Sequence, residues 1–128
     1  MCIRDSDVAL EVYNELMDSV AEANKRGVSD EQIIIDPGLG FAKNNQQNLI
    51  LLSNLEKFTR SKFPVLVGPS RKRFIGYILE QENPNKRIFG TAAVVCRCVH
   101  AKVSLLRVHD VFEIDQTLKM ANSLWPNN

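Results

Sequence analysis

The chain of 128 residues is long enough for one compact domain with its own core, and its composition, 45% hydrophobic and 24% charged, is ordinary. Its formal net charge of +1 argues against a nucleic-acid or membrane-surface protein, which would carry a larger basic excess. No apolar run approaches the roughly 20 residues that cross a bilayer, and the N-terminus shows no secretory signal, so we expect a protein that is not secreted.

The N-terminal region predicts one long helix. Residues 1–6 ("MCIRDS") fit poorly with the helical pattern that begins at residue 7, and we interpret them as a non-native N-terminus or artefact, which leaves 7–128 as a partial domain. From 7 to 25 the apolar residues recur at helical spacing, and Gly27 comes next as a stop signal. The apolar residues of this pattern are Val8, Val12, Leu16 and Val20.

Two short apolar runs predict buried strands. Ile33–Ile35 is an unbroken β-branched run that ends at Asp36, and Pro64–Val67 is a second run that ends at Gly68. Runs without polar interruption are typical of strands that are buried on both faces, as in parallel sheets. Between the two runs, apolar residues at helical spacing predict one helix over 46–60.

The remainder repeats this alternation. We expect a short helix over 72–79, a long helix over 87–102, a strand over 105–108 and a final helix over 111–124. The order α-β-α-β-α-α-β-α requires crossover connections and therefore a parallel sheet. Three strands are too few for a closed barrel, which needs eight, so the chain has the character of the C-terminal part of a larger α/β unit.

The chain contains three cysteines, an odd number that fits a reducing compartment better than a disulfide framework. Cys96 and Cys98 lie two residues apart on a predicted helix and so point in different directions, which makes a metal-binding pair unfavourable. We expect both to be structural.

Polar residues of both signs come directly after the three predicted strands. Asp36 ends the first strand and precedes "PGLGF", "GPSRKR" comes after the second, and "RVHD", with Arg107 and His109, belongs to the third. Ligands of parallel α/β folds bind at the carboxyl ends of the strands. This grouping is the strongest functional signal in the sequence.

Each of these residues also has a purely structural interpretation. Asp36 before Pro-Gly is suited to starting a turn, and Gly38 and Gly40 are suited to positive φ angles. The phosphate-loop pattern GxxxxGK[ST] is absent. Ser70 is suited to capping the short helix after it. A lone histidine after a strand, such as His109, is more often structural than catalytic.

The cations favour the functional interpretation. Arg71, Lys72 and Arg73 stand at a predicted helix start, where positive charge opposes the helix dipole, so a bound anion or acceptor explains them better. Arg107 and His109 are two residues apart and leave the same face of an extended chain. Together they can hold a phosphate or diphosphate, the arginine through paired N–H bonds.

Taken together, these groups suit transfer of an electrophilic carbon from a diphosphate ester. A carboxylate such as Asp36 can accept two N–H bonds from an amidine-like heterocycle edge, and a lysine can donate to a ring carbonyl or nitrogen. An arginine and a histidine can stabilise a departing diphosphate.

Four stretches of the chain resemble dihydropteroate synthase, in the order and at the spacings of that family. They are "IIIDPGLGFAKNNQQNLILLSNL", "PVLVGPSRKRFIG", "GTAA" and "LLRVHDV". The resemblance runs from about residue 7 to 125 and is greatest with the eukaryotic form fused to hydroxymethyl-dihydropterin pyrophosphokinase. It implies the C-terminal part, about strands six to eight, of a (β/α)8 TIM barrel. The family condenses 6-hydroxymethyl-7,8-dihydropterin diphosphate with p-aminobenzoate to 7,8-dihydropteroate.

The resemblance also implies roles for individual residues. Asp36 and Gly40 would bind the pterin, the first through its carboxylate and the second through its backbone. Lys72 would contact polar atoms of the pterin ring. Arg107 and His109 would hold the leaving diphosphate and, with Lys72, form the catalytic set.

For the second substrate, the resemblance places Phe41 in the p-aminobenzoate slot. Bacterial members often have a serine after the lysine that contacts the aminobenzoate carboxylate. This chain has Arg73 there, and an arginine can meet a carboxylate equally well. Arg71 receives no role.

Several motifs of the family are absent from the sequence, namely the early Asn-Val-Thr-Pro-Asp-Ser and Asp-Gly-Gly-Glu-Ser stretches and the later Asp and Asn of the pterin site. Mg²⁺, which the resemblance implies with the diphosphate, would take its ligands from that missing half, so we assign it no ligand in this chain. We expect the chain alone to be inactive or very weak. The full-length form is expected to be a homodimer in the cytoplasm or an organelle (mitochondrial if eukaryotic), without nucleic-acid or membrane partners.

Two alternatives remain open. The pterin-binding domain of corrinoid-dependent methyltransferases is a sister barrel that shares a strand-end Asp but has no diphosphate leaving group, so the "SRK" and "RVHD" cations favour the synthase. The second alternative is a non-catalytic remnant that serves only as a structural or interaction module. The strand-end residues argue against it, whereas the missing half of the site keeps it open.

Overall fold

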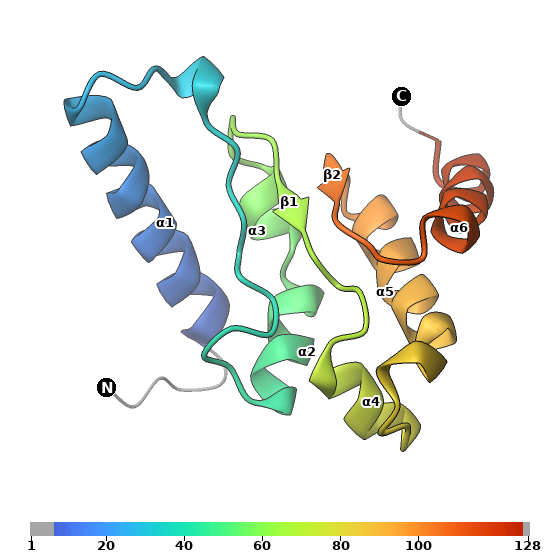
Figure 1. The fold of residues 1–128 in the computed structure, drawn as a ribbon. Helices are drawn as coiled ribbons and strands as arrows, with labels where there is room; N and C mark the ends of the chain where they lie inside the picture. The colour runs from blue at the N-terminus through green and yellow to red at the C-terminus, as the bar shows by residue number, and fades with distance from the viewer. Residues whose placement is uncertain (1–6, 127–128) are drawn as a thin grey trace.

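A computed structural model describes residues 7–126, so the interpretation of residues 1–6 lies outside the described part of the chain. Helices alternate with short extended segments (Figure 1). The helices are α1 (Val8–Lys25), α2 (Asn45–Ser53), α3 (Glu56–Thr59), α4 (Arg73–Leu79), α5 (Ile88–His100) and α6 (Val111–Leu124), the short 3-10 turns are η2 (Asp30–Gln32) and η3 (Pro84–Lys86), and the strands are β1 (Leu66–Val67) and β2 (Leu105–Leu106). None of these helices is long and apolar enough to cross a membrane.

The three predicted strands lie side by side and run parallel. β1 pairs with β2 in the register Leu66 to Leu105, and Ile35 forms a parallel bridge to Val65. The first predicted strand is therefore present only as that bridge, fixed by a backbone bond from Leu66 N to Ile35 O of 2.9 Å. Because all three segments run the same way, the loops at their carboxyl ends leave from one edge of the sheet.

One face of this sheet is covered by helices, whereas the other is largely open among residues 7–126. Ile35, Val65 and Val67 are buried, whereas Ile34 is 54% and Leu105 is 42% exposed. Side chains alternate between the two faces of an extended chain, and the buried set packs on residues of α1 to α5. The prediction that the first strand is buried on both faces is therefore wrong for the described residues, since Ile34 has no cover.

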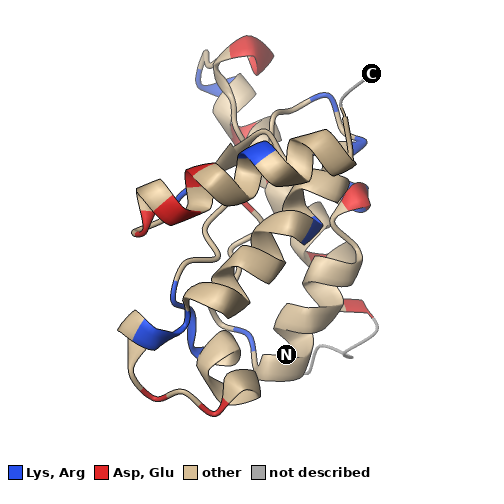
Figure 2. Cartoon of the chain, turned by 90° about the vertical axis from the view of Figure 1, so that its right-hand side faces the viewer, with Lys and Arg blue, Asp and Glu red and all other residues tan. Residues whose placement is uncertain are grey.

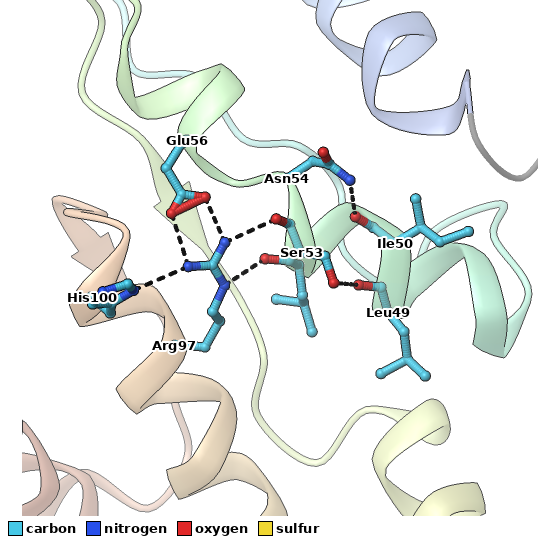
Figure 3. A network of polar contacts seen from close by, with 8 residues as sticks. Leu49, Ile50, Ser53, Asn54, Glu56, Arg97 and His100 are labelled. Atoms are coloured by element: carbon cyan, nitrogen blue, oxygen red, sulfur yellow. Dashed lines mark hydrogen bonds and ion pairs between the residues drawn. The ribbon is translucent and has the colours of Figure 1, made fainter.

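The predicted helix over 46–60 is divided into α2 and α3, so that prediction is wrong in one respect. A polar network marks the break (Figure 3). Arg97 on α5 donates from Nε to Leu52 O (2.8 Å) and from Nη2 to Ser53 O (3.1 Å), and its guanidinium also pairs with Glu56. Asn54 Nδ2 donates to Ile50 O at 2.8 Å. These donors satisfy carbonyls at the end of α2 that a continuing helix would use itself.

The other helices agree with the pattern-based predictions. α1, α4 and α5 match within two residues at each end, and α6 matches at both ends. Gly27 has the positive φ (94°) expected of a helix stop, and Cys98 is fully buried in the core as a structural cysteine. Acidic and basic residues both occur along the helices and loops (Figure 2), so a cationic cluster in this chain must act locally.

Candidate active site at the strand-end loops

Three loops leave the same edge of the sheet and carry the predicted site residues except Arg73, which is the first residue of α4. The first loop is 36–44, the second is 68–72 and the third is 107–110. Their backbone is unusual, since Ala42 (φ 52°) and Arg71 (φ 60°) adopt left-handed conformations that cost free energy for residues other than glycine. Side-chain hydrogen bonds hold these conformations in place.

The first loop is tied down by three side chains. Asp36 Oδ1 accepts from Gly38 N at 2.8 Å, and Oδ1 of Asn48, a buried residue of α2, accepts from Gly40 N at 2.8 Å. Lys43 Nζ donates to Gly38 O at 2.8 Å and to Phe41 O at 2.9 Å. The turn interpretation of Asp36 is thus correct, and it occupies one carboxylate oxygen. Asp36 itself is exposed, and within residues 7–126 its Oδ2 has no hydrogen-bond partner.

Lys43 is half-buried, and burial lowers the pKa of its ammonium group because the charged form loses solvation. The negative charges of Glu15 and Asp36 act in the opposite direction and favour the charged form. The ammonium group is therefore held by two backbone carbonyls of its own loop. This makes Lys43 an anchor of the loop.

Lys72 joins the second loop to the first. A Cβ atom on Gly40 would lie only 3.0 Å from Lys72 Cδ, so the lysine stem packs directly on that glycine. Lys72 Nζ lies 4.5 Å from the centroid of the Phe41 ring, within the range of a cation–π contact. Phe41 is 67% exposed, so one face of its ring remains accessible. Three of the predicted residues (Gly40, Phe41 and Lys72) are thus in mutual contact.

A cavity of about 610 Å³ opens beside this contact, in the range typical of small-molecule sites. Gly40, Lys72 and Arg73 line it, together with Lys43 and the exposed Tyr77 among others. Arg73 therefore lines the same cavity as Lys72, which agrees with the prediction that it contacts the p-aminobenzoate carboxylate. The remaining predicted residues do not line this cavity.

Arg107 lies next to the second loop. A Cβ atom on Gly68 would come within 4.0 Å of Arg107 Cβ, and Arg107 N donates to Val67 O at 3.1 Å. Its side chain is exposed and borders a separate hollow of about 390 Å³ with Val108 and Val111. The described residues thus bring the loops of Asp36, Lys72, Arg107 and His109 to one edge, but they do not enclose all four side chains in one pocket.

Ser70 contacts His109 across 39 residues of chain. Its Oγ lies 2.7 Å from His109 Nδ1 and accepts from His109 N at 3.0 Å. The prediction that Ser70 caps the short helix is wrong, because α4 begins after Lys72, which occupies the N-cap position. The buried hydroxyl is already used by His109.

Arg71 forms the neighbouring contact between the same two loops. Its Nη2 donates to Asp110 Oδ1 at 2.8 Å. The hydrogen bond with Arg71 holds the pKa of Asp110 below its ordinary value, and in turn raises the pKa of Arg71. The expectation that the three cations at positions 71–73 bind an external anion or acceptor is therefore wrong for Arg71. Its guanidinium forms an ion pair with Asp110 of the same chain.

Two further side chains support Arg71 through its backbone. Thr91 Oγ1, fully buried on α5, accepts from Arg71 N at 3.2 Å, and Arg87 Nη1 donates to Arg71 O at 2.9 Å. Sequence reasoning missed both of them, as well as Lys43, Asn48 and Asp110. Thr91 lies in the quoted motif "GTAA", but no local pattern shows that its hydroxyl reaches a loop 20 residues earlier.

Within residues 7–126, no three His, Cys, Asp or Glu side chains come together as ligands for a metal ion. The chemistry available at this edge is that of hydrogen-bond donors and positive charge, together with the exposed carboxylate of Asp36 as an acceptor.

Comparison with known proteins gives a consistent assignment. Residues 2–109 match the family described as pterin binding enzyme. The chain is 50% identical over 103 residues to dihydropteroate synthase of Synechocystis sp., covering 80% of the chain and 36% of that protein. It is 37% identical over 124 residues to the folic acid synthesis protein fol1 of Pneumocystis carinii, covering 94% and 17%.

A solved structure agrees along nearly the whole chain. Dihydropteroate synthase of Coxiella burnetii, in complex with pteroic acid, superposes with a TM-score of 0.92 and 35% identity over 97% of this chain and 46% of that one. This confirms the predicted fold class, a part of a TIM barrel. The chain spans less than half the length of these relatives. The predicted likeness to the fused eukaryotic form is not confirmed, since the Synechocystis protein has the higher identity.

Proposed function

Because the chain belongs to the pterin binding enzyme family, we propose that it supplies the C-terminal part of the active site of a dihydropteroate synthase. The reaction joins 6-hydroxymethyl-7,8-dihydropterin diphosphate to p-aminobenzoate. The C–O bond at the pterin methylene breaks, a C–N bond forms to the arylamine, and diphosphate and a proton are released. The observation that carries this proposal is the meeting of the Lys72 loop with the first loop on one side and with the Arg107–His109 loop on the other.

The first loop and Lys72 are proposed to hold the pterin. Asp36 is exposed and has one carboxylate oxygen unused within the described residues, so it can accept N–H bonds from an amino-pyrimidine edge. Lys72 reaches past Gly40, where the missing side chain leaves room for the lysine stem to pack on the backbone. The ammonium group can donate to a ring carbonyl or nitrogen.

Arg107 and His109 are proposed to bind the diphosphate as it leaves. Both are exposed at the strand-end edge. An arginine binds two oxygens of a phosphate through parallel N–H bonds, and such charge-assisted bonds strengthen as negative charge develops on the leaving group. No side chain of this chain has to act as a covalent nucleophile, since the arylamine attacks the methylene carbon directly.

The p-aminobenzoate is proposed to bind between Phe41 and Arg73. The exposed ring of Phe41 offers a flat apolar surface, and Arg73 lines the same cavity as Lys72. In support, the Coxiella burnetii relative binds pteroic acid, a molecule that contains both the pterin and the aminobenzoate moieties. The carboxylate of the substrate would then face Arg73.

We also propose the settings in which this site operates. The full-length protein would act as a homodimer, in the cytoplasm or in an organelle. Mg²⁺ would accompany the diphosphate with ligands from outside this chain.

The test is dihydropteroate formation by the full-length protein that contains this chain, with Arg107→Ala as the variant. Loss of one charge-assisted contact costs on the order of 1.5–3 kcal/mol, so we expect kcat/KM to fall roughly tenfold to a hundredfold. Unchanged catalysis in the variant would favour a non-catalytic remnant. A wild-type protein that binds its pterin but not inorganic pyrophosphate would favour the corrinoid-dependent methyltransferase alternative.

A further inference from the structure

The Ser70 hydroxyl makes two contacts with a single residue, His109. Ser70 is only 6% exposed, and its Oγ lies 3.0 Å from the His109 backbone nitrogen and 2.7 Å from the ring Nδ1. The two residues lie at the ends of neighbouring parallel strands, so the hydroxyl fixes both the backbone and the ring of His109. This arrangement limits where the imidazole proton can be.

The proton balance of the hydroxyl decides the form of the ring. A serine hydroxyl has one proton to donate and two lone pairs to accept with. The His109 backbone N–H can only donate, so it uses one lone pair. If Nδ1 also donated, the hydroxyl proton would need another acceptor, and among residues 7–126 Ser70 Oγ has no other partner. Because Ser70 is nearly fully buried, an unpaired hydroxyl proton would be costly.

All polar atoms are satisfied when the Ser70 O–H donates to Nδ1. A neutral imidazole carries one proton, so it must then be on Nε2. His109 is exposed at the edge where the diphosphate is proposed to leave, and Nε2 is the ring nitrogen not occupied by Ser70. The ring therefore offers an N–H donor at that edge without requiring a positive charge.

We propose that Ser70 is a positioning residue that holds His109 in the Nε2–H tautomer, so that His109 acts as a neutral hydrogen-bond donor to the diphosphate. This inference rests on the proposed diphosphate role of His109 and specifies its form. Arg107 then provides the positive charge at this edge, and His109 provides a hydrogen bond from a fixed Nε2–H group, which orients the diphosphate.

The experiment is ¹⁵N NMR of the histidine side chains in the full-length protein, at about pH 8, above the ordinary imidazole pKa of about 6.5. The His109 resonances are assigned by their disappearance in His109→Gln. We expect a protonated Nε2 and an unprotonated Nδ1 in the wild-type protein without ligand. In Ser70→Ala we expect a mixture of both tautomers and binding of inorganic pyrophosphate that is about three- to tenfold weaker, the effect of one neutral hydrogen bond.

Asp110→Asn is the matched control, because it weakens the neighbouring Arg71 contact between the same loops but leaves Ser70 in place. We expect this variant to keep the Nε2–H tautomer. A wild-type spectrum with the proton on Nδ1 overturns the inference, even if Ser70→Ala fails to fold. So does a Ser70→Ala protein with an unchanged tautomer. A wild-type protein that shows the Nε2–H tautomer but does not bind pyrophosphate instead overturns the proposed function, and with it the donor role.

Discussion

Arg87 is a buried side chain whose removal should disturb the second loop and the turn before α5. It is 8% exposed and donates three hydrogen bonds to backbone carbonyls, from Nε to Gln81 O (2.9 Å), from Nη1 to Arg71 O (2.9 Å) and from Nη2 to Glu82 O (2.8 Å). A Cβ atom on Gly76 would lie 2.4 Å from the guanidinium carbon, so α4 leaves space for this group. We predict that Arg87→Met lowers the free energy of unfolding substantially.

The size of the effect depends on where the three carbonyls lie. A hydrogen bond to a charged group contributes about 1.5–3 kcal/mol net. Glu82 is exposed and Gln81 is half-buried, so water can replace the donor at these two carbonyls once the guanidinium is gone. The Arg71 carbonyl belongs to a loop already fixed by Thr91, which leaves it less able to turn toward water. Counting one to two bonds as lost without replacement gives about 1.5–6 kcal/mol.

The assay is equilibrium urea unfolding of the full-length protein, monitored by circular dichroism, with the midpoint and the slope both fitted. Lys86→Met is the matched control, because Lys86 is an exposed cation one residue earlier in the same turn. Surface substitutions of this kind change stability by less than about 0.5 kcal/mol. If Arg87→Met also falls within that limit, the three carbonyl bonds do not stabilise the loop and the reasoning is refuted.

Three further predictions concern packing, charge and completeness. Gly90→Ala would place a Cβ atom 2.3 Å from Ile75 Cγ2, where α5 meets α4. It should lower the free energy of unfolding in urea by about 1–3 kcal/mol. A variant as stable as the wild type would contradict this, because the two helices would then accommodate the extra methyl group without cost. The hydrogen bond with Arg97 lowers the pKa of Glu56 in the folded state, so its stabilisation is present above the ordinary glutamate pKa and is lost as the pH falls through the folded-state value. Glu56→Gln should therefore be less stable than the wild type at pH 7, with the gap closing below about pH 4; a gap independent of pH would contradict this. The 128-residue chain alone should form dihydropteroate far more slowly than the full-length protein, since an open sheet leaves strand edges and Ile34 without cover, and comparable turnover would refute it.

Most of the helices and the ends of the first two extended segments could be predicted from the sequence because both depend on local pattern, whereas the third strand ends at Leu106, two residues before its predicted end. Apolar spacing is sufficient for α1 and α6, and a run of polar residues after an apolar segment marks the end of a strand. The division between α2 and α3 could not be predicted in this way. It depends on Arg97, more than 40 residues later, whose guanidinium reaches the carbonyls at the end of α2. The pattern of residues 46–60 alone therefore cannot show where the helix breaks.

The same limit applies to the site. The sequence indicates that Asp36, Lys72, Arg107 and His109 lie at the ends of parallel strands, and parallel pairing then brings their loops to one edge. It does not indicate which cations are compensated. Arg71 and Lys72 are adjacent cations with the same local pattern, and only the fold shows that Arg71 faces Asp110 whereas Lys72 faces Gly40 and Phe41.

The cations at the strand-end edge therefore have two different roles: Arg71 fixes the position of loops, whereas Lys72 and Arg107 provide positive charge. Ser70, Arg71 and Lys72 are consecutive, yet each contacts a different partner, so the second loop fixes the third loop and the first loop relative to each other. Among the described residues, Lys72 and Arg107 have no carboxylate within ion-pair distance, whereas the charge of Arg71 is neutralised by Asp110. An anion arriving at this edge therefore meets the uncompensated charges of Lys72 and Arg107. The ion pair of Arg71 adds little to that field, and its contribution is the fixed separation between the two loops that carry those charges.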